Sequence, residues 1–356
     1  MLSCLPGLLL LSACSFSTDQ SDDAPDGQSA SAPSASAGDP LHFADAGGPA
    51  VAFEETPVLR AQVLLDRLGF SPGVIDGEEG QSYDAALRAF QLSRGLDESG
   101  KLDQPTLAAM QEWSDVPATR LVTIPAAFAK GPFFPDLPDD AAKQAELPTL
   151  GYKNLMEALA ERFHTTPDAL VALNSPDTKI GAGKVIRVPN IADVAPLAGT
   201  DERDWSATLQ KLGVASKQPT ASKLVVDKSE GVLKAYDADG KLIGQFPATM
   251  GSSHDPLPIG QWTIKGVSHN PEFHYNPELF WDVSDDKDAQ LLPPGPNGPV
   301  GVVWIDLSKP HYGIHGTGAP DTIGRAESHG CVRLTNWDAA RLAQMVKPGV
   351  KAVFQE

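Results

Sequence analysis

The chain has 356 residues, 41% of them hydrophobic and 21% charged, which is long enough for two or three domains and apolar enough for packed cores. Its 46 acidic residues against 28 basic ones give a formal net charge of −18 at pH 7. This charge disfavours nucleic-acid phosphates and anionic lipid headgroups as electrostatic partners, whereas a partner that carries amines is easily accommodated.

Residues 1–14 predict a targeting segment. A leucine run, too short to span a bilayer, ends in Leu11-Ser12-Ala13-Cys14. These four residues resemble a bacterial lipobox, in which cleavage leaves Cys14 as a lipid-modified N-terminus. An ordinary signal peptide or a mis-assigned start stays open, because the segment lacks a basic beginning. The lipobox resemblance implies a periplasmic, lipid-anchored protein, and Ser15 favours the outer over the inner membrane.

Residues 15–56 are mostly Ser, Ala, Asp, Gly and Pro, with eight acids and no Lys or Arg. Such a composition cannot bury enough apolar area to offset chain entropy. We therefore expect a disordered acidic tether.

Residues 57–113 have helical periodicity. The expected apolar faces are formed by Val58, Leu59, Val63, Leu64, Leu65 and Leu68, by Ala85, Ala86, Leu87, Phe90 and Leu92, and by Leu102, Leu107 and Met110. The segments Leu65-x-x-Leu68-Gly69-Phe70, Gly73-x-x-Asp76-Gly77 and Ala86-Leu87-x-x-Phe90-Gln91 resemble the core of the peptidoglycan-binding domain. The region is thus expected to be a small three-helix bundle that binds peptidoglycan, with a spacer role as the alternative.

A Pro-rich connection, 125–148, leads to a second small module at 144–191. Its segments Leu159-Ala160-Glu161-Arg162-Phe163, Leu170-x-x-Leu173-Asn174 and Gly183-x-x-Ile186-x-Val188-Pro189-Asn190 are similar to a lysin motif (LysM), a βααβ unit that grips N-acetylglucosamine polymers. The usual opening strand is absent around Gly151-Tyr152-Lys153. We expect the LysM-like fold here. The missing strand argues against sugar binding more than against the fold.

After a linker that ends near Ser222, residues 222–355 alternate as strands, with a hairpin turn at Asp237–Gly240. A helix closes the region, because Thr335 with Asp338 forms a capping box before an apolar stripe. The prediction is a mainly-β, β-sandwich-like domain with a C-terminal helix.

Cys331 is the one cysteine outside the first fourteen residues. A thiol with pKa about 8.5 needs a neighbouring base to become a competent nucleophile, and His315 or His329 can supply it. Gly330 leaves the backbone open, so the amides of Gly330 and Cys331 can point at an oxyanion. Zinc binding by His, His and Cys is an alternative that lacks a fourth ligand, and a buried structural cysteine is another.

Two segments carry a long and specific resemblance. Gly313-Ile314-His315-Gly316-Thr317 and Ser328-His329-Gly330-Cys331-Val332-Arg333-Leu334 resemble the signature of the L,D-transpeptidase catalytic domain, of the YkuD or ErfK type. Residues 250–264 and the Pro-Gly-rich loop 293–301 resemble two further segments of that domain.

The resemblance implies cysteine acyl transfer on peptidoglycan stem peptides, without metal or cofactor. Cys331 is then the nucleophile, His315 accepts and returns the proton, and His329 and Gly330 assist or hold the oxyanion. Gly316 orients the imidazole through its carbonyl, and Ser328, Gly316 and Arg333 are candidates for steadying substrate. An L,D-carboxypeptidase or endopeptidase, in which water resolves the thioester, remains an alternative. A non-catalytic wall-binding lipoprotein is the alternative from another class.

Overall fold

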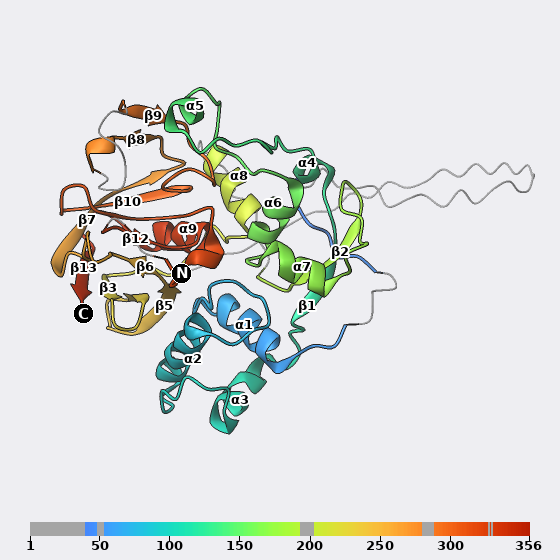
Figure 1. The fold of residues 1–356 in the computed structure, drawn as a ribbon. Coiled ribbons are helices and arrows are strands. Elements are labelled where there is room, and N and C mark those ends of the chain that lie inside the picture. The colour runs from blue at the N-terminus through green and yellow to red at the C-terminus, as the bar shows by residue number, and fades with distance from the viewer. Residues whose placement is uncertain (1–39, 48–52, 193–202, 280–287, 327, 329) are drawn as a thin grey trace, which may run out of the picture. The chain divides into compact units, whose positions relative to one another are not determined.

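The structure is a computed structural model that describes residues 40–47, 53–192, 203–279, 288–326, 328 and 330–356 (Figure 1). The predicted signal segment with Cys14, most of the tether, and His329 lie outside the described residues. None of the described helices is both long and apolar enough to cross a membrane.

The region 57–113 folds as helices, as its periodicity predicts. Its elements are α1 (Pro57–Arg67), α2 (Gln81–Arg94), α3 (Gln104–Met110) and the 3-10 helix η1 (Gln111–Trp113). Local chemistry sets their limits: the Thr56 hydroxyl accepts a hydrogen bond from Leu59 N at 3.2 Å, and Gly95 ends α2 in the left-handed conformation (φ 66°).

Most of the expected apolar faces are buried, and two positions are not. Leu65, Leu87 and Phe90 are fully buried. Leu92 is 41% exposed and Leu107 is 36% exposed, so their placement in the core was wrong. Leu92 lies in the last turn of α2, at the end of the periodic stretch. Leu107 lies in a seven-residue helix, which has too few turns for periodicity to define a face.

Residues 40–47 overturn part of the predicted tether. Phe43 is buried, with its ring centroid 4.9 Å from that of Phe128. The backbone forms an antiparallel bridge between Asp45 and Val122. The prediction failed here because an average composition hides the local apolar side chain that anchors this stretch.

The middle region is built on a two-stranded antiparallel sheet. It contains β1 (Thr119–Thr123), α4 (Ala126–Ala129), α5 (Ala141–Ala145), α6 (Leu155–Arg162), α7 (Pro167–Leu173) and β2 (Val185–Pro189). β1 pairs with β2, with Thr119 opposite Pro189. The pairing strand thus precedes the expected start of the module at 144, because a long connection with α4 and α5 separates it from α6. Whether this region is a LysM that binds sugar stays a prediction.

The C-terminal region is mainly β, as predicted. Its strands are β3 (Lys223–Asp227), β4 (Val232–Tyr236), β5 (Leu242–Pro247), β6 (Thr249–Met250), β7 (Gly260–His269), β8 (Phe273–Tyr275), β9 (Gln290–Leu292), β10 (Val303–Leu307), β11 (Gly313–His315), β12 (Val332–Arg333) and β13 (Lys351–Gln355). The helical elements are α8 (Arg203–Leu212), η2 (Pro277–Leu279), η3 (Pro320–Thr322) and α9 (Asn336–Met345).

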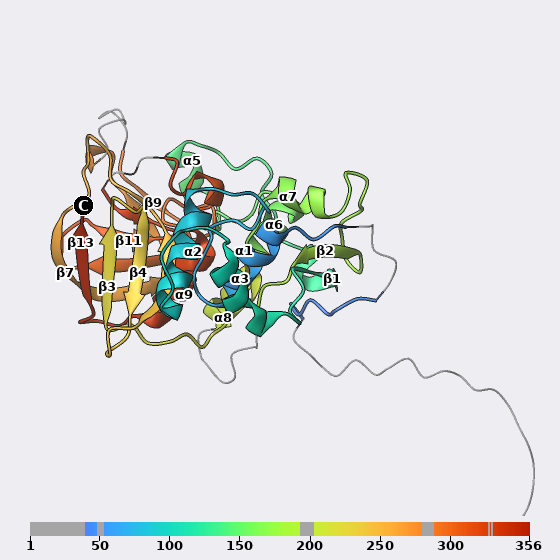
Figure 2. The same ribbon diagram turned by 90° about the horizontal axis from the view of Figure 1, so that it is seen from below.

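One sheet of described strands has the order β5-β4-β3-β13-β7-β10-β11-β12-β6. Figure 2 shows β13, β3 and β4 side by side within it. Its edge strands β5 and β6 are separated in the chain only by Ala248, which limits the distance from Pro247 Cα to Thr249 Cα to about 7 Å. The two edges therefore meet, and the sheet folds back on itself.

The expected linker after Asn190 contains a helix that the sequence analysis missed. Trp205, Leu209 and Leu212 of α8 are buried and join the same apolar core as the sheet. A helix of this length shows few apolar turns, so its periodicity gives a weak signal.

A buried ionic cluster joins all three regions. The Arg341 guanidinium of α9 makes two hydrogen bonds of 2.9 Å to the Asp66 carboxylate of α1. His164, which follows α6, has its Nδ1 3.0 Å from Asp66 Oδ1 and stacks on Trp337 with ring centroids 5.1 Å apart. Burial alone raises the pKa of Asp66, but Arg341 and His164 outweigh it and hold that pKa below its ordinary value. The carboxylate is thus ionised and paired at neutral pH.

Replacing Arg341 with Met should destabilise the protein by about 3–5 kcal/mol, because it leaves a buried carboxylate without its cation. Urea unfolding at pH 7 measures this change. The matched control is Lys228→Ala, which removes the exposed ion pair between Lys228 and Glu356 and should cost about 1 kcal/mol or less. Equal losses for the two variants would contradict the importance of the buried cluster.

Candidate active site

The two halves of the sequence signature meet as parallel strands. β11 pairs with β12, with Ile314 opposite Val332 and His315 opposite Arg333. Alternate residues of a strand share a face, so His315 and Arg333 lie on one face of the sheet. Cys331 lies directly before β12, two residues from Arg333. The pairing thus brings the segments that carry the thiol and the imidazole side by side.

Cys331 is partly exposed. Its Sγ donates to His311 O at 3.8 Å. Burial raises the pKa of the thiol, while the Gly313 backbone and the Arg333 charge lower it by less. The sulfur is therefore mostly protonated at neutral pH, and its attack requires a base.

His315 has the properties of such a base. Its Nδ1 lies 2.8 Å from Gly316 O, and a carbonyl only accepts, so Nδ1 carries the proton and Nε2 keeps its lone pair. Burial lowers the pKa of His315 to about 4, with Arg333 adding to the effect and the Gly316 carbonyl opposing it. The imidazole is neutral across physiological pH. The hydrogen bond to the Gly316 carbonyl is the one expected from sequence.

Ser328 hydrogen-bonds the segment before Cys331 to Gly251, the residue that follows β6. Ser328 Oγ donates to Cys331 O at 2.7 Å and accepts from Gly251 N at 2.7 Å. Ser328 is buried, so its hydroxyl holds the backbone of this segment. Its predicted contact with substrate stays a prediction.

Gly330 cannot be replaced without strain. Its φ of 88° lies in the region that favours glycine, and a Cβ there would be 2.6 Å from Tyr312 Cε1. The oxyanion role expected for the Gly330 and Cys331 amides is compatible with this open backbone and stays a prediction, as does the role of His329.

The charge of Arg333 acts on both the Cys331 thiol and the His315 imidazole. Its charge lowers the pKa of Cys331 and of His315. Burial in turn lowers the pKa of Arg333 itself. Its Nε is buried and has no hydrogen-bond partner among the described residues.

Asn336, at the start of α9, is a site residue that the sequence analysis missed. Its Oδ1 accepts a hydrogen bond from Val302 N at 3.2 Å. A Cβ added to Gly316 would lie 2.2 Å from the same oxygen, so Asn336 fills the space that a larger residue at 316 would need. Its Nδ2 donates to Pro296 O at 3.0 Å and to Glu161 Oε1 at 2.8 Å. The capping box located this helix start, but no pattern indicated its contact with the residue that orients His315.

Glu161 comes from α6 of the middle region, far from the signature in sequence. Burial raises its pKa to about 7, although Tyr152 and Asn336 lower it. Nothing in the local sequence distinguishes this glutamate from a surface one, so only the tertiary structure could reveal its position.

The Pro-Gly-rich loop 293–301 is packed against the middle region. Pro294 O accepts from Leu150 N at 2.9 Å and from Thr149 Oγ1 at 2.7 Å. A Cβ on Gly295 would lie 2.3 Å from Leu150 O, so only glycine permits this approach. The loop is therefore a fixed support of the site.

Among the described residues, no group of three or more His, Cys, Asp or Glu side chains is arranged to hold a metal ion.

Comparison with known proteins identifies the type of domain that carries this site. Residues 221–354 match the family model of the L,D-transpeptidase catalytic domain (YkuD), and residues 54–110 match that of a putative peptidoglycan binding domain. A putative L,D-transpeptidase YkuD from Bacillus licheniformis is 27% identical over 198 residues, 55% of this chain and 90% of that protein.

Two further relatives cover shorter stretches. The putative L,D-transpeptidase YkuD of Bacillus subtilis is 52% identical over 59 residues, 17% of this chain and 36% of that protein. The probable L,D-transpeptidase YbiS of Escherichia coli is 29% identical over 137 residues, 37% of this chain and 44% of that protein.

Replacing Ser328 with Ala should slow acylation of Cys331 by about tenfold or more, because the Cys331 carbonyl and the Gly251 amide each lose a buried partner worth about 1–3 kcal/mol. Stopped-flow measurement with a chromogenic β-lactam tests this. The control is Ser308→Ala, which removes an acceptor for Thr263 N at 3.0 Å in another part of the sheet. A rate for S328A equal to that of S308A would contradict the positioning role.

Replacing Glu161 with Gln should remove a pH dependence of stability. A folded-state pKa of about 7, above the ordinary 4.5, means that Glu161 favours the folded state most below pH 4.5 and loses this contribution as pH rises through 7. Gln stays neutral, so the free energy of unfolding of E161Q relative to wild type should rise by up to about 3 kcal/mol over that interval.

Urea titrations at several pH values measure the difference, with the exposed Glu98→Gln as control. A difference for E161Q that stays constant between pH 4.5 and 7.5 would contradict the raised pKa.

Proposed function

We propose that the chain, whose residues 221–354 form an L,D-transpeptidase catalytic domain, acts on the stem peptides of peptidoglycan through a thioester on Cys331. The observation that carries the proposal is the parallel pairing of β11 with β12, which lays the strand that carries His315 beside the segment that follows Cys331. The peptidoglycan-binding domain at 54–110 supports the choice of substrate.

The first half-reaction forms the acyl-enzyme. Neutral His315 takes the thiol proton at Nε2 as Cys331 Sγ attacks the carbonyl that precedes a terminal D-alanine. The backbone amides of Gly330 and Cys331 donate to the oxyanion, a contribution of roughly 3–4 kcal/mol for one such donor in other enzymes. His315 then returns the proton to the departing D-alanine amine.

The second half-reaction reverses these roles. The side-chain amine of another stem attacks the thioester, His315 accepts its proton, and the thiol leaves with that proton restored. Arg333 steadies the substrate. The net result is a cross-link between stems, or attachment of another amine to the cell wall.

We also propose that the protein is periplasmic and lipid-anchored at Cys14, with the outer membrane as its site. The support is the residue run Leu11-Ser12-Ala13-Cys14, which lies outside the described residues. A Cys14→Ser variant should move from the membrane fraction to the soluble periplasmic fraction.

The pH profiles of acylation for the wild type and for a His315 variant should identify the base. With the pKa of His315 at about 4 and that of Cys331 raised, the neutral pair persists across pH 5.5–8, and the wild-type rate should be level. His315→Gln leaves only the small thiolate fraction, so its rate should be lower and rise about tenfold per pH unit. Carbapenem acylation, followed by intact mass, gives both profiles.

Cys331→Ser serves as the control that should form no thioester adduct. A level profile in H315Q, or an adduct outside Cys331, would contradict the assignment.

Products from a purified disaccharide-tetrapeptide distinguish transpeptidation from hydrolysis. We expect cross-linked dimers that are absent with Cys331→Ser. Tripeptides without dimers would instead favour an L,D-carboxypeptidase, and no reaction with folded protein would favour a binding role.

A further inference from the structure

The turn between β10 and β11 lies beside the thiol, and the proposed reaction steps do not use it. Residues 309–312 form this turn, in which Tyr312 N donates to Lys309 O at 3.3 Å. Pro310 is its second residue, and His311, the third, has a φ of 67°. Proline at the second position and a positive φ at the third are typical of a type II turn, whose third residue is usually Gly or Asn.

His311 is therefore strained, because a side chain with a β carbon disfavours the left-handed region. Such strain persists only where surrounding contacts hold it, and it gathers at functional sites. One contact of His311 is with the proposed nucleophile, since His311 O accepts from Cys331 Sγ at 3.8 Å. The turn is thus shaped around the thiol.

Tyr312 packs the same turn against the residue before the thiol. A Cβ added to Gly330 would lie 2.6 Å from Tyr312 Cε1 and 3.3 Å from Tyr312 Oη, so the ring fills the space beside Gly330. Burial raises the pKa of Tyr312, and the charges of Asp255 and Cys331 add to this effect. The phenol stays protonated at neutral pH, and it lies within electrostatic reach of both an acid and the thiol.

Lys309 places a cation beside this ring. Its Nζ lies 5.2 Å from the centroid of the Tyr312 ring and 5.6 Å from that of the Trp262 ring on β7. The Trp262 ring is itself held, because its Nε1 donates to Pro258 O at 2.8 Å. Lys309 makes no ion pair within the part of the chain that the structure describes. The two rings orient the ammonium and leave its charge without an anion.

An oriented cation beside an acyl-transfer thiol suits an anionic part of the donor. A stem that ends in D-alanine has a free carboxylate on that residue, because the scissile amide is the only bond that joins D-alanine to the stem. Three bonds separate the attacked carbonyl carbon from the carboxylate carbon, a span of at most about 4 Å. The carboxylate must therefore lie close to the thiol when the bond is attacked.

The other charges near the thiol make Lys309 the group that decides whether this carboxylate is accepted. Asp255 acts on Tyr312 and would repel an anion on that side of the site. Arg333 lies on β12, opposite His315, whereas Lys309 lies on the turn that packs against Gly330.

We propose that Lys309, held by the Tyr312 and Trp262 rings, binds the terminal carboxylate of the donor stem and so selects donors that end in a free D-amino acid. The identity of the donor rests on the proposed function. The departing D-alanine takes the carboxylate with it, so Lys309 acts in the first half-reaction only.

The test compares two tetrapeptide stems that differ only at the end, one with the free D-alanine carboxylate and one with its primary amide. Titrations followed by NMR use the Cys331→Ser protein at low salt, so that binding is measured apart from catalysis. We expect the free acid to bind about fivefold tighter, as one partly exposed ion pair would allow. Raising NaCl to about 0.5 M should reduce this preference.

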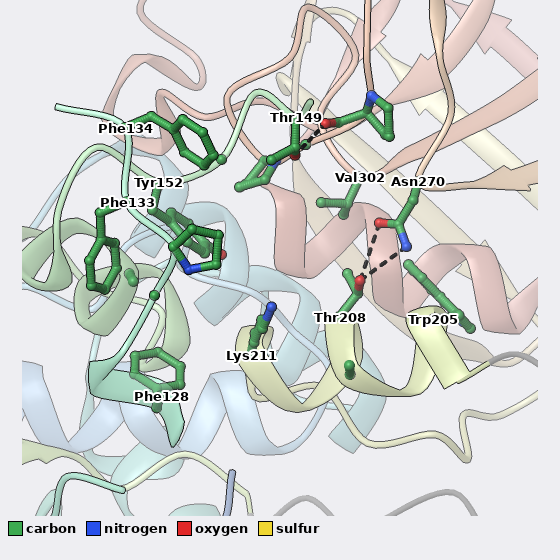
Figure 3. Close-up of a pocket in the computed structure, with 18 of the residues that line it drawn as sticks. Phe128, Phe133, Phe134, Thr149, Tyr152, Trp205, Thr208, Lys211, Asn270 and Val302 are labelled. Atoms are coloured by element: carbon green, nitrogen blue, oxygen red, sulfur yellow. Dashed lines mark hydrogen bonds between the residues drawn. The ribbon is translucent and has the colours of Figure 1, made fainter. Parts of the chain in front are cut away.

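Variants of two lysines locate the preference. Lys309→Gln should abolish it, and Lys309→Arg, which keeps a cation that stacks on aromatic rings, should retain it. The matched control is Lys211→Gln, because Lys211 of α8 is exposed and lines a separate cavity of about 760 Å³ that includes no residue of 309–333 (Figure 3). This change should leave the preference as it is.

Thermal unfolding verifies that the variants are folded. The preference is a ratio of two affinities for the same protein, so a general loss of stability in K309Q does not imitate its loss.

Equal affinities for the two stems, absence of binding at millimolar stem, or a preference that K309Q leaves unchanged would overturn the proposal. These results are separable from the proposed function, which carbapenem acylation of Cys331 tests without a stem. Acylation without the preference refutes only the carboxylate site. A preference that depends on Lys309, without any acylation, contradicts only the proposed function.

Discussion

The parallel pairing of β11 with β12 is the constraint on which the site depends. It sets His315 opposite Arg333, with Cys331 directly before the adjacent strand. Parallel neighbours need a crossover, and here the crossover is the segment between the two signature halves. Ser328 holds the chain before Cys331 through hydrogen bonds to the Cys331 carbonyl and from the Gly251 amide.

The site is supported by all three regions of the chain. The middle region reaches it through Glu161, which accepts from Asn336 Nδ2, and through Leu150, which bonds to the loop before the signature. The helical region reaches the same helix, α9, through the pairing of Asp66 with Arg341. The small modules are thus structural parts of the catalytic unit as well as candidates for wall binding. Removing either one should disturb α9, where Asn336 and Arg341 both lie.

Much of this could be read from the sequence, because the relevant signals were local. The hairpin of β3, β4 and β5, the strands β7, β10 and β11, and the helix capped by Thr335 follow from spacing and turn chemistry, whereas β13, which pairs with β3 and β7, was not among the expected strands. The features that the sequence did not predict depend on contacts between residues far apart in the chain. Phe43 looked like part of a polar tether, and β1 was separated from α6 by a long connection. Glu161 and Asn336 gave no local sign of their contact, because burial of a carboxyl group beside an amide is a property of the assembled fold.

The central claim is that the Cys331 sulfur carries the acyl group during the reaction. Its most direct test is rapid-quench mass spectrometry of the protein mixed with a disaccharide-tetrapeptide donor in the absence of an acceptor. The account predicts a transient adduct whose mass equals the donor minus D-alanine, located by digestion on the peptide that contains Cys331. Cross-linked product formed at the wild-type rate by a Cys331→Ala variant would contradict it.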